Sequence, residues 1–317
     1  MQGFTYILSL TSPIFLLIGL GFLVVRLGYL SRDAIRTFAW FVINFGLPAA
    51  MFKALSSRSF QDILHFDYLL IFGLGSLLSF AVLFVIARLR NKSLTECAMF
   101  GLGGSLSNSL MIGFPIIMQL FGEAALVPFA LTLIVENFFI LPLALALADT
   151  GQQRNEGFLR SLGAALPQLL KNPVVMSIGV GLVSALTGLQ PPAFVNKAID
   201  MLAVTVGGLA LFTIGGMLVG LKPRGMLTDI SVIVLGKLIL HPLCIVLMIL
   251  LMPPMPALFQ SVALVLACMP MFSIYAVFGM RYGMDELCSA VLLPATLLAF
   301  VSINLMIWIL DVGSAVG

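Results

Sequence analysis

The sequence predicts an all-α integral membrane protein with ten transmembrane helices in two inverted repeats of five. Three observations support this fold class: the composition, the number of long apolar segments, and a match between the two halves. Of the 317 residues, 61% are hydrophobic and 9% are charged, whereas soluble domains carry about a quarter charged residues. So few charges cannot cover a water-facing surface, and the net charge of +3 is scattered. We therefore expect a lipid environment and no nucleic-acid partner.

A helix that crosses about 30 Å of hydrocarbon needs roughly 20 apolar residues. Ten segments meet this requirement: 5–25, 34–54, 67–87, 95–121, 124–148, 172–189, 196–219, 228–252, 257–280 and 286–310. The longest connection is LADTGQQRNEGFLRSLGAALPQLLK, whose later part has apolar residues at helical spacing and predicts a short surface helix. The expected division is a first repeat at 1–150, a cytoplasmic linker at 151–171 and a second repeat at 172–317.

The basic residues predict the orientation, because cytoplasmic loops are enriched in Lys and Arg. Loops after even-numbered segments contain only Lys53, Arg58 and Lys197, and Lys237 falls inside a segment. Both termini are thus expected on the non-cytoplasmic side of a bacterial inner membrane. The other twelve basic residues lie in the loops after odd-numbered segments, which are therefore expected on the cytoplasmic side. They are Arg26, Arg32, Arg36, Arg88, Arg90, Lys92, Arg154, Arg160, Lys171, Lys222, Arg224 and Arg281.

An internal repeat relates the two halves. SPIFLLIGLGFLVVRLGYL at 12–30 aligns with NPVVMSIGVGLVSALTGLQ at 172–190 at a fixed offset, and such self-similarity is common in transporters. The alternative is coincidence in a chain with 29 Gly and 16 Pro. Five helices per repeat would force the second repeat to enter the membrane from the opposite side. The matched pairs are Pro13 and Pro173, Gly19 and Gly179, Gly21 and Gly181, and Gly28 and Gly188.

Two corresponding segments carry helix-breaking residues near their middle. The segment 95–121 contains SLSNSLMIGFP, with Pro115, and the segment 257–280 contains Pro270. Proline removes a backbone donor and interrupts a helix, and unpaired backbone is tolerated only inside the protein or beside a watery cavity. A matched pair of interrupted segments predicts a transporter binding site. The alternative is a simple proline kink whose Ser and Asn side chains bond to neighbouring helices.

The interrupted segments also suggest which residues bind the substrate. Half-helices after Pro115 and Pro270 would present the positive ends of their dipoles, which suit a carboxylate. The expected side-chain contacts come from Ser107, Asn108 and Ser109, with Ser273 beyond the second proline and Asn44 facing the same cavity from 34–54.

Several motifs resemble those of the auxin efflux carrier family, which includes the PIN-type carriers. SNSLMIGFPIIMQLFG at 107–122 resembles the fourth-helix motif, and the likeness covers nearly the whole chain in the same order of motifs. His241 departs from the plant pattern, where a small residue is usual. The length is similar to that of the bacterial branch. The other matching stretches are NFGLPAAMF, KNPVVMSIGVGL, LALFTIGGMLVG, GKLILHPLCIV and MPMFSIYAVFGMRYGMDELCSAVLL.

The resemblance implies a fold like that of the bile-acid symporters and NhaA, with broken helices four and nine crossing. It implies a scaffold of helices 1, 2, 6 and 7, a transport domain of helices 3–5 and 8–10, and a homodimer formed through the scaffold. It also implies that Asn108, Pro115 and Pro270 line the substrate site. Substrates of the family are organic anions, indole-acetate in plants and malonate- or malate-like acids proposed for bacterial members.

Three ionisable residues fall near the middle of apolar segments: Glu136, Lys237 and His241. A charge inside a bilayer costs at least about 2.5–3.5 kcal/mol, so such residues are usually paired or functional. We expect Glu136 and Lys237 to lie close together near the crossing, as a proton-sensitive support for a substrate carboxylate or as a fixed ion pair. His241 would either join them or bond to a backbone carbonyl. Asn137 is expected on a different face of its helix from Glu136.

The sequence thus predicts a carrier for a small mono- or dicarboxylate that works by alternating access, and not an enzyme. Transport coupled to H⁺ or to Na⁺, and transport driven by the membrane potential alone, all fit the sequence. The alternatives are an intramembrane enzyme that uses Glu136 and His241, or an anion channel. No cofactor or metal site is expected, because the four cysteines have no paired spacing. They are Cys97, Cys244, Cys268 and Cys288.

Overall fold

The computed structural model describes residues 2–56, 65–152, 171–220 and 226–310. Within these ranges the regular elements are helices, with one isolated β-bridge. Six of these helical stretches are long and apolar enough to cross a membrane, and shorter apolar helices accompany them. The chain is therefore a multi-pass membrane protein. The surface helix predicted in the linker, and Arg58, Arg154, Arg160, Lys222 and Arg224, lie outside the described residues.

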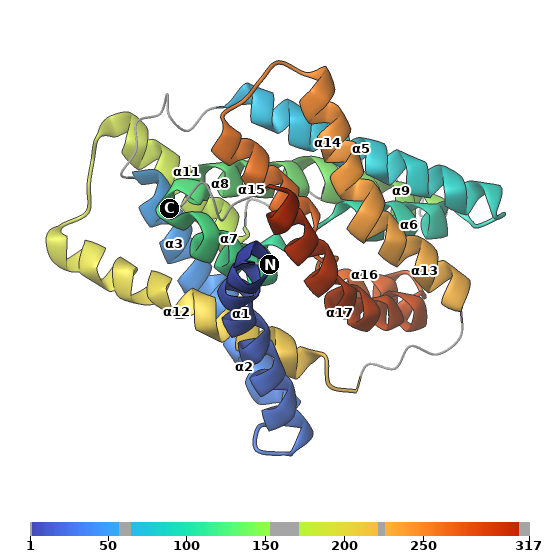
Figure 1. The fold of residues 1–317 in the computed structure, drawn as a ribbon, viewed down its shortest axis with the longest axis horizontal. Helices are drawn as coiled ribbons and strands as arrows, with labels where there is room; N and C mark the ends of the chain where they lie inside the picture. The colour runs from blue at the N-terminus through green and yellow to red at the C-terminus, as the bar shows by residue number, and fades with distance from the viewer. Residues whose placement is uncertain (1, 57–64, 153–170, 221–225, 311–317) are drawn as a thin grey trace.

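The first half of the chain forms helices that cover the first five predicted segments (Figure 1). Two of these segments are single helices, and the other three are divided by short π-helical or 3₁₀ turns or by an interruption. In order they are α1 (Gln2–Arg26), α2 (Arg32–Phe41), α3 (Leu47–Ser56), α5 (Phe66–Leu89), α6 (Leu94–Ser105), α7 (Phe114–Phe121), α8 (Leu126–Val135) and α9 (Leu141–Gly151).

The second half covers the remaining predicted segments in the same way. Its elements are α11 (Pro173–Thr187), α12 (Ala193–Met217), α13 (Leu227–Leu235), α14 (His241–Leu251), α15 (Ala257–Ala267), α16 (Tyr275–Arg281) and α17 (Asp285–Ile309). One gap separates α15 from α16, and another separates α6 from the helical turn before α7. Both predicted interruptions are therefore present.

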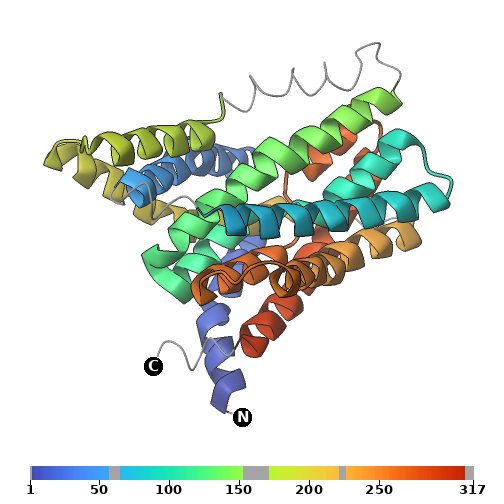
Figure 2. The same ribbon diagram turned by 90° about the horizontal axis from the view of Figure 1, so that it is seen from above.

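The helices pack in two groups. One group contains α1, α2, α3, α11 and α12, with α12 crossing α1 and α3 packing on α11. The other contains α5, α6, α9, α13, α14, α15, α16 and α17. The groups lie on opposite sides in Figure 1 and again in Figure 2. Helices α7 and α8 connect them, because α7 contacts α12 and α8 contacts both α3 and α5.

Ion pairs hold the loop ends of the second group together. Asp229, at the start of α13, accepts from Arg90 at 2.7 Å and from Lys92 at 2.8 Å. Lys92 donates from its ammonium group to Asp229, and this hydrogen bond raises the pKa of Lys92. Arg281, at the end of α16, pairs with Asp149 of α9 at 3.0 Å. Helices from both halves of the sequence are thus joined within one group.

Four π-helical turns lie within the described helices, and each is followed by an X-Pro pair. The residue before each proline donates its N–H to the carbonyl five positions earlier, as His241 does to Gly236. The widened turn moves the preceding carbonyls away from the proline ring, which would clash in a regular helix. The turns are Val42–Gly46, Ser109–Gly113, Glu136–Ile140 and Gly236–Leu240, and the prolines are Pro48, Pro115, Pro142 and Pro242.

This arrangement corrects the predicted role of Pro115. The interruption lies earlier, where Leu106 is extended and the helical hydrogen bonds stop, and the chain is helical again from Ser109. Pro115 sits in the first turn of α7 and is buried there. The π-helical turn accommodates the proline, so it does not break the helix. Pro270, in contrast, lies inside the second interruption as predicted.

Glycines allow α1 and α12 to approach closely. A Cβ on Gly21 would lie 1.9 Å from the carbonyl oxygen of Phe212, and one on Gly215 would lie 1.8 Å from that of Ile18. Small residues at such crossings are typical of membrane helix pairs. The close approach of α1 and α12 therefore depends on these two positions.

Gly215→Ala should separate α1 from α12 and destabilise the protein by about 1–3 kcal/mol, the usual cost of overpacking. The measurement is thermal unfolding of the purified protein in detergent. Gly207→Ala is the matched control, because it lies in the same helix and a Cβ there meets no atom within 4 Å. Equal stability of the two variants would contradict the packing described.

Candidate functional site

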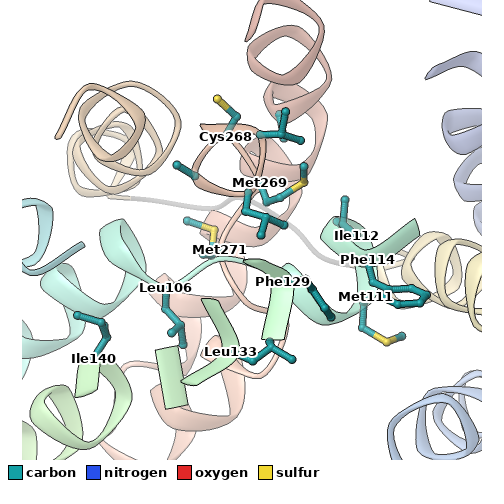
Figure 3. Packing of buried hydrophobic residues seen from close by; sticks show 14 of the residues in the cluster. Leu106, Met111, Ile112, Phe114, Phe129, Leu133, Ile140, Cys268, Met269 and Met271 are labelled. Atoms are coloured by element: carbon teal, nitrogen blue, oxygen red, sulfur yellow. The ribbon is translucent and has the colours of Figure 1, made fainter. Parts of the chain in front are cut away.

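The two interruptions cross and supply each other with hydrogen bonds. Ser107 forms an antiparallel bridge with Met271, and the backbone N–H of Asn108 donates to the carbonyl oxygen of Pro270 at 2.8 Å. The side-chain amide of Asn108 donates to the Ser273 hydroxyl at 2.7 Å. The backbone groups released by one break are thus partly paired by the other. Apolar side chains surround the crossing, with Leu106 and Met271 labelled beside it (Figure 3).

A cavity of about 90 Å³ adjoins the crossing, which is room for several water molecules. Its polar lining comes from both interruptions, from the π-helical turn after α8 and from the start of α11. Its apolar lining includes residues of α2 and the end of α12, so both helix groups contribute. The polar residues are Ser107, Asn108, Glu136, Asn137, Asn172 and Ser273, and the apolar ones include Ala39, Ile43, Leu133, Met217 and Phe272.

Glu136 lies in the wall of this cavity and is 3% exposed. Its Oε1 accepts from the Ser109 hydroxyl at 2.8 Å and from the backbone N–H of Ser107 at 3.2 Å. Its position in a π-helical turn is in keeping with the frequent occurrence of such turns at functional sites. The Glu136 carboxyl group therefore stabilises the interruption at Ser107–Ser109 from the cavity side.

Lys237 bonds to the same interruption, at Ser107, from the side away from the cavity. Its ammonium contacts three acceptors: the Ser107 hydroxyl at 2.8 Å, the carbonyl of Ala267 at 3.0 Å and Nδ1 of His241 at 2.6 Å. An ammonium has three N–H donors, so this set satisfies all of them. Nδ1 of His241 then accepts, which leaves its Nε2–H to donate to the Ser76 hydroxyl at 2.9 Å.

The sequence prediction that Glu136 and Lys237 lie near each other at the crossing agrees with this geometry. They are joined through Ser107, whose N–H bonds to the carboxylate and whose hydroxyl bonds to the ammonium. Among the described residues no direct ion pair within 4.0 Å links them, so the fixed-ion-pair alternative is not what the structure shows. His241 bonds to the side chains of Ser76 and Lys237 and also lies against the Ala267 carbonyl, in keeping with both expectations for it.

Other predicted site residues lie apart from the cavity. The amide of Asn44 donates to the Trp40 carbonyl of its own helix at 2.8 Å, and Asn44 is not among the residues that line the cavity. Pro115 and Pro270 are also outside the lining, although Pro270 bonds to Asn108. Glu136 and His241, the pair considered for an enzyme, are separated by Ser107 and Lys237.

Two asparagines that sequence reasoning did not select line the cavity. Asn137 follows Glu136 in the same π-helical turn and also lines the cavity, while its amide donates to the Leu133 carbonyl of its own helix at 2.8 Å. Asn172 caps α11, where its Oδ1 accepts from the N–H of Val174 at 2.9 Å. The dipeptide Asn-Pro is a recognisable helix start, but nothing local in the sequence places it against the crossing.

The cysteines at 97, 244, 268 and 288 are free and buried. Within the described ranges, His, Cys, Asp and Glu form no group of three or more that could hold a metal ion.

A buried crossing of two broken helices beside a polar cavity is an arrangement found in membrane transporters. The chain matches the model of the family described as "Membrane transport protein" over residues 6–307. It therefore belongs to this family of membrane transport proteins, the auxin efflux carriers that its motifs resemble, and to the bacterial branch.

Similar curated proteins agree with this membership. A Rhizobium meliloti (strain 1021) protein named "Putative malonate transporter" is 30% identical over 314 residues, 97% of each chain. An "Uncharacterized transporter YfdV" of Escherichia coli (strain K12) is 24% identical over 77% of this chain and 78% of its own. The "Lysosomal cholesterol signaling protein" of Mus musculus is 23% identical over 70% of this chain, which matches 27% of the mouse protein.

Ser107→Ala should destabilise the protein by about 1–3 kcal/mol, because a buried charged donor on Lys237 loses its acceptor. Thermal unfolding in detergent measures the effect. Ser105→Ala is the matched control, since that buried hydroxyl donates only to the Gly101 carbonyl of its own helix at 2.7 Å. If Ser105→Ala lowers stability as much as Ser107→Ala, the hydrogen bond from Lys237 to Ser107 does not contribute more to stability than an ordinary buried hydroxyl group.

Proposed function

We propose that this protein is a carrier that moves a small organic anion, such as malonate, malate or an auxin-like acid, by alternating access at the crossing. The observation that supports this most is the cavity beside two paired helix interruptions, to which both helix groups contribute. Relatives named as transporters favour a carrier over an enzyme. The name of the Rhizobium relative favours malonate as the first acid to test.

We further propose that the chain consists of two inverted repeats. The matched glycines occupy similar places: Gly28 and Gly188 have positive φ angles of 82° and 69° just after α1 and α11. Gly21 contacts α12 and Gly181 contacts α3, and a Cβ on Gly19 or Gly179 would meet open space. Under this repeat α1 corresponds to α11 and α12 to α3, so the two close helix pairs are equivalent as well.

The two helix groups suit the roles of a fixed scaffold and a moving transport domain. The first group contains the helices of segments one, two, six and seven. The second contains those of segments three, eight, nine and ten, with α6 of segment four and α9 of segment five, while α7 and α8 connect the two groups. The cavity lies where they meet. A domain that carries the crossing could shift along α2, α3 and α12 and expose the cavity to each side in turn.

The chemistry of the cavity suits an anion in three ways. Asn108, Asn137 and Asn172 bring amide groups that can donate hydrogen bonds to a carboxylate. The helical stretch from Ser109 through α7 begins at the crossing, so its positive end points there. Lys237 supplies a positive charge one hydroxyl group away, behind Ser107.

The enzyme alternative is less well supported, because Glu136 and His241 do not contact each other. Ion pairs also join helices near the end of α12 that lies away from the cavity. Lys53 of α3 pairs with Glu123 at 3.1 Å and with Asp200 of α12 at 3.0 Å. Asp200 and the cavity residue Met217 are about 25 Å apart along α12 at 1.5 Å per residue, so these pairs lie on the far side from the cavity.

Purified protein in liposomes should take up radiolabelled malonate, malate or indole-acetate saturably, and Asn108→Ala should slow uptake about tenfold or more. The variant lacks an amide donor that lines the cavity and bonds to Ser273. A hydrogen bond to a charged partner contributes more than about 1.4 kcal/mol, and that free energy corresponds to a tenfold change. Asn196→Ala is the control, because this amide bonds to Pro191 near the other end of α12. Full uptake by Asn108→Ala would contradict a site at the crossing.

Glu123 lies in the turn Gly122–Ala125 between α7 and α8, which the predicted division assigns to the transport domain, whereas Lys53 lies in the scaffold helix α3. Locking this contact should therefore stop transport. In a background without native cysteines, Lys53→Cys with Glu123→Cys is bridged by a short bis-methanethiosulfonate reagent, which forms a disulfide with each thiol. This variant should lose most uptake and regain it when the disulfides are reduced. Lys53→Cys with Asp200→Cys links α3 to α12 within one group and should leave uptake unchanged. Uptake by the locked Lys53–Glu123 pair would argue against movement of the domains.

A further inference from the structure

We propose that Glu136 takes up one proton when the anionic substrate binds, so that the carrier moves a proton together with each anion. This inference rests on the proposed function and specifies its coupling ion. The geometry that supports it is a carboxyl group in the cavity wall, joined by a single serine to a buried ammonium group.

The charges around the crossing balance when the cavity is empty of solute. Lys237 makes the three bonds expected of an ammonium, and His241, which accepts one of them, is uncharged in that arrangement. An ionised Glu136 then balances Lys237 through Ser107. An incoming carboxylate would place a second negative charge beside the first, and burying an unbalanced charge is very costly. A proton on Glu136 removes this imbalance.

Among the residues that the structure describes, no other group facing Glu136 supplies the missing positive charge. From α5, Tyr68 bonds to Thr132 at 2.6 Å, one turn before Glu136. From the crossing come only the uncharged groups of Ser107, Asn108 and Ser109. The remaining ionisable groups nearby are His241 and the Cys268 thiol, both on the Lys237 side of the crossing. The single positive charge of Lys237 can therefore balance either an ionised Glu136 or the substrate carboxylate, but not both.

Glu136 also has an atom suited to carry the proton. Both of its hydrogen bonds are accepted by Oε1, and Oε2 has no hydrogen-bond partner among the described residues. With a proton on Oε2, the group becomes a donor that faces the cavity and can bond to a substrate carboxylate. The bonds from Ser107 and Ser109 to Oε1 remain in place, so the crossing keeps its structure.

The proton balance is simple. The substrate anion enters from one side, Glu136 accepts one proton from the same side, and the positive charge of Lys237 then balances the substrate. After the domain moves, the substrate leaves and Glu136 releases the proton. A monoanion crosses with no net charge, and a dianion crosses with one net negative charge.

Isothermal titration calorimetry tests the proposal directly. Malonate is titrated into the purified wild-type protein at pH 7.5 in buffers of different ionisation enthalpy, and the slope gives the protons taken up per malonate. We expect a value near one for the wild type and near zero for Glu136→Gln, which carries no titratable group but keeps the shape. The affinity of the wild type should fall up to about tenfold per pH unit as pH rises, and that of Glu136→Gln should stay constant.

Glu286→Gln is the matched control, because this exposed glutamate at the start of α17 is remote from the cavity; it should keep the wild-type value. If Glu136→Gln does not fold, Glu136→Ala replaces it. Binding without proton uptake in the wild type, or with equal uptake in the Glu136 variants, overturns this inference and leaves the carrier standing. Binding of none of malonate, malate and indole-acetate by folded wild-type protein overturns the proposed function, and the inference with it.

Discussion

The structure depends on one constraint, the need to pair backbone groups where a helix is interrupted inside an apolar environment. Neither interruption can satisfy this need alone, because the helical hydrogen bonds stop at Leu106 in one segment and at Cys268 in the other. Each break supplies partners for the other at Ser107, Asn108 and Pro270. Two segments about 165 residues apart in the chain must therefore meet at one point, and the helices around them are arranged accordingly.

The same constraint explains why polar side chains gather at this point. Where two extended strands cross, some backbone donors have no backbone acceptor, and Glu136 accepts one of them from Ser107. Lys237 bonds to the carbonyl of Ala267 at the end of α15, so it caps the other segment. The two ionisable groups are thus part of the support of the crossing as well as of its electrostatics. A buried network of this kind is stable only when each member is satisfied.

The sequence predicted the helices well because long apolar segments and the bilayer thickness determine them almost alone. It also predicted both interruptions and the proximity of Glu136 and Lys237, since mid-segment charges and prolines are rare enough to be informative. It misplaced the break at Pro115, because a π-helical turn accommodates the proline within a continuous helical stretch. Asn172 was missed for another reason: its place at the cavity depends on tertiary packing between segments far apart in sequence.

The π-helical turn before Pro242 has a consequence for the direction of Lys237. Each residue advances a helix by about 100°, so the extra residue in this turn rotates everything before it relative to α14. Proline favours this wider turn, since its ring would crowd the carbonyl four residues earlier in a regular helix. Pro242 does not line the cavity beside the crossing. It nevertheless favours the rotation that directs the Lys237 ammonium group toward Ser107, five residues from the proline ring.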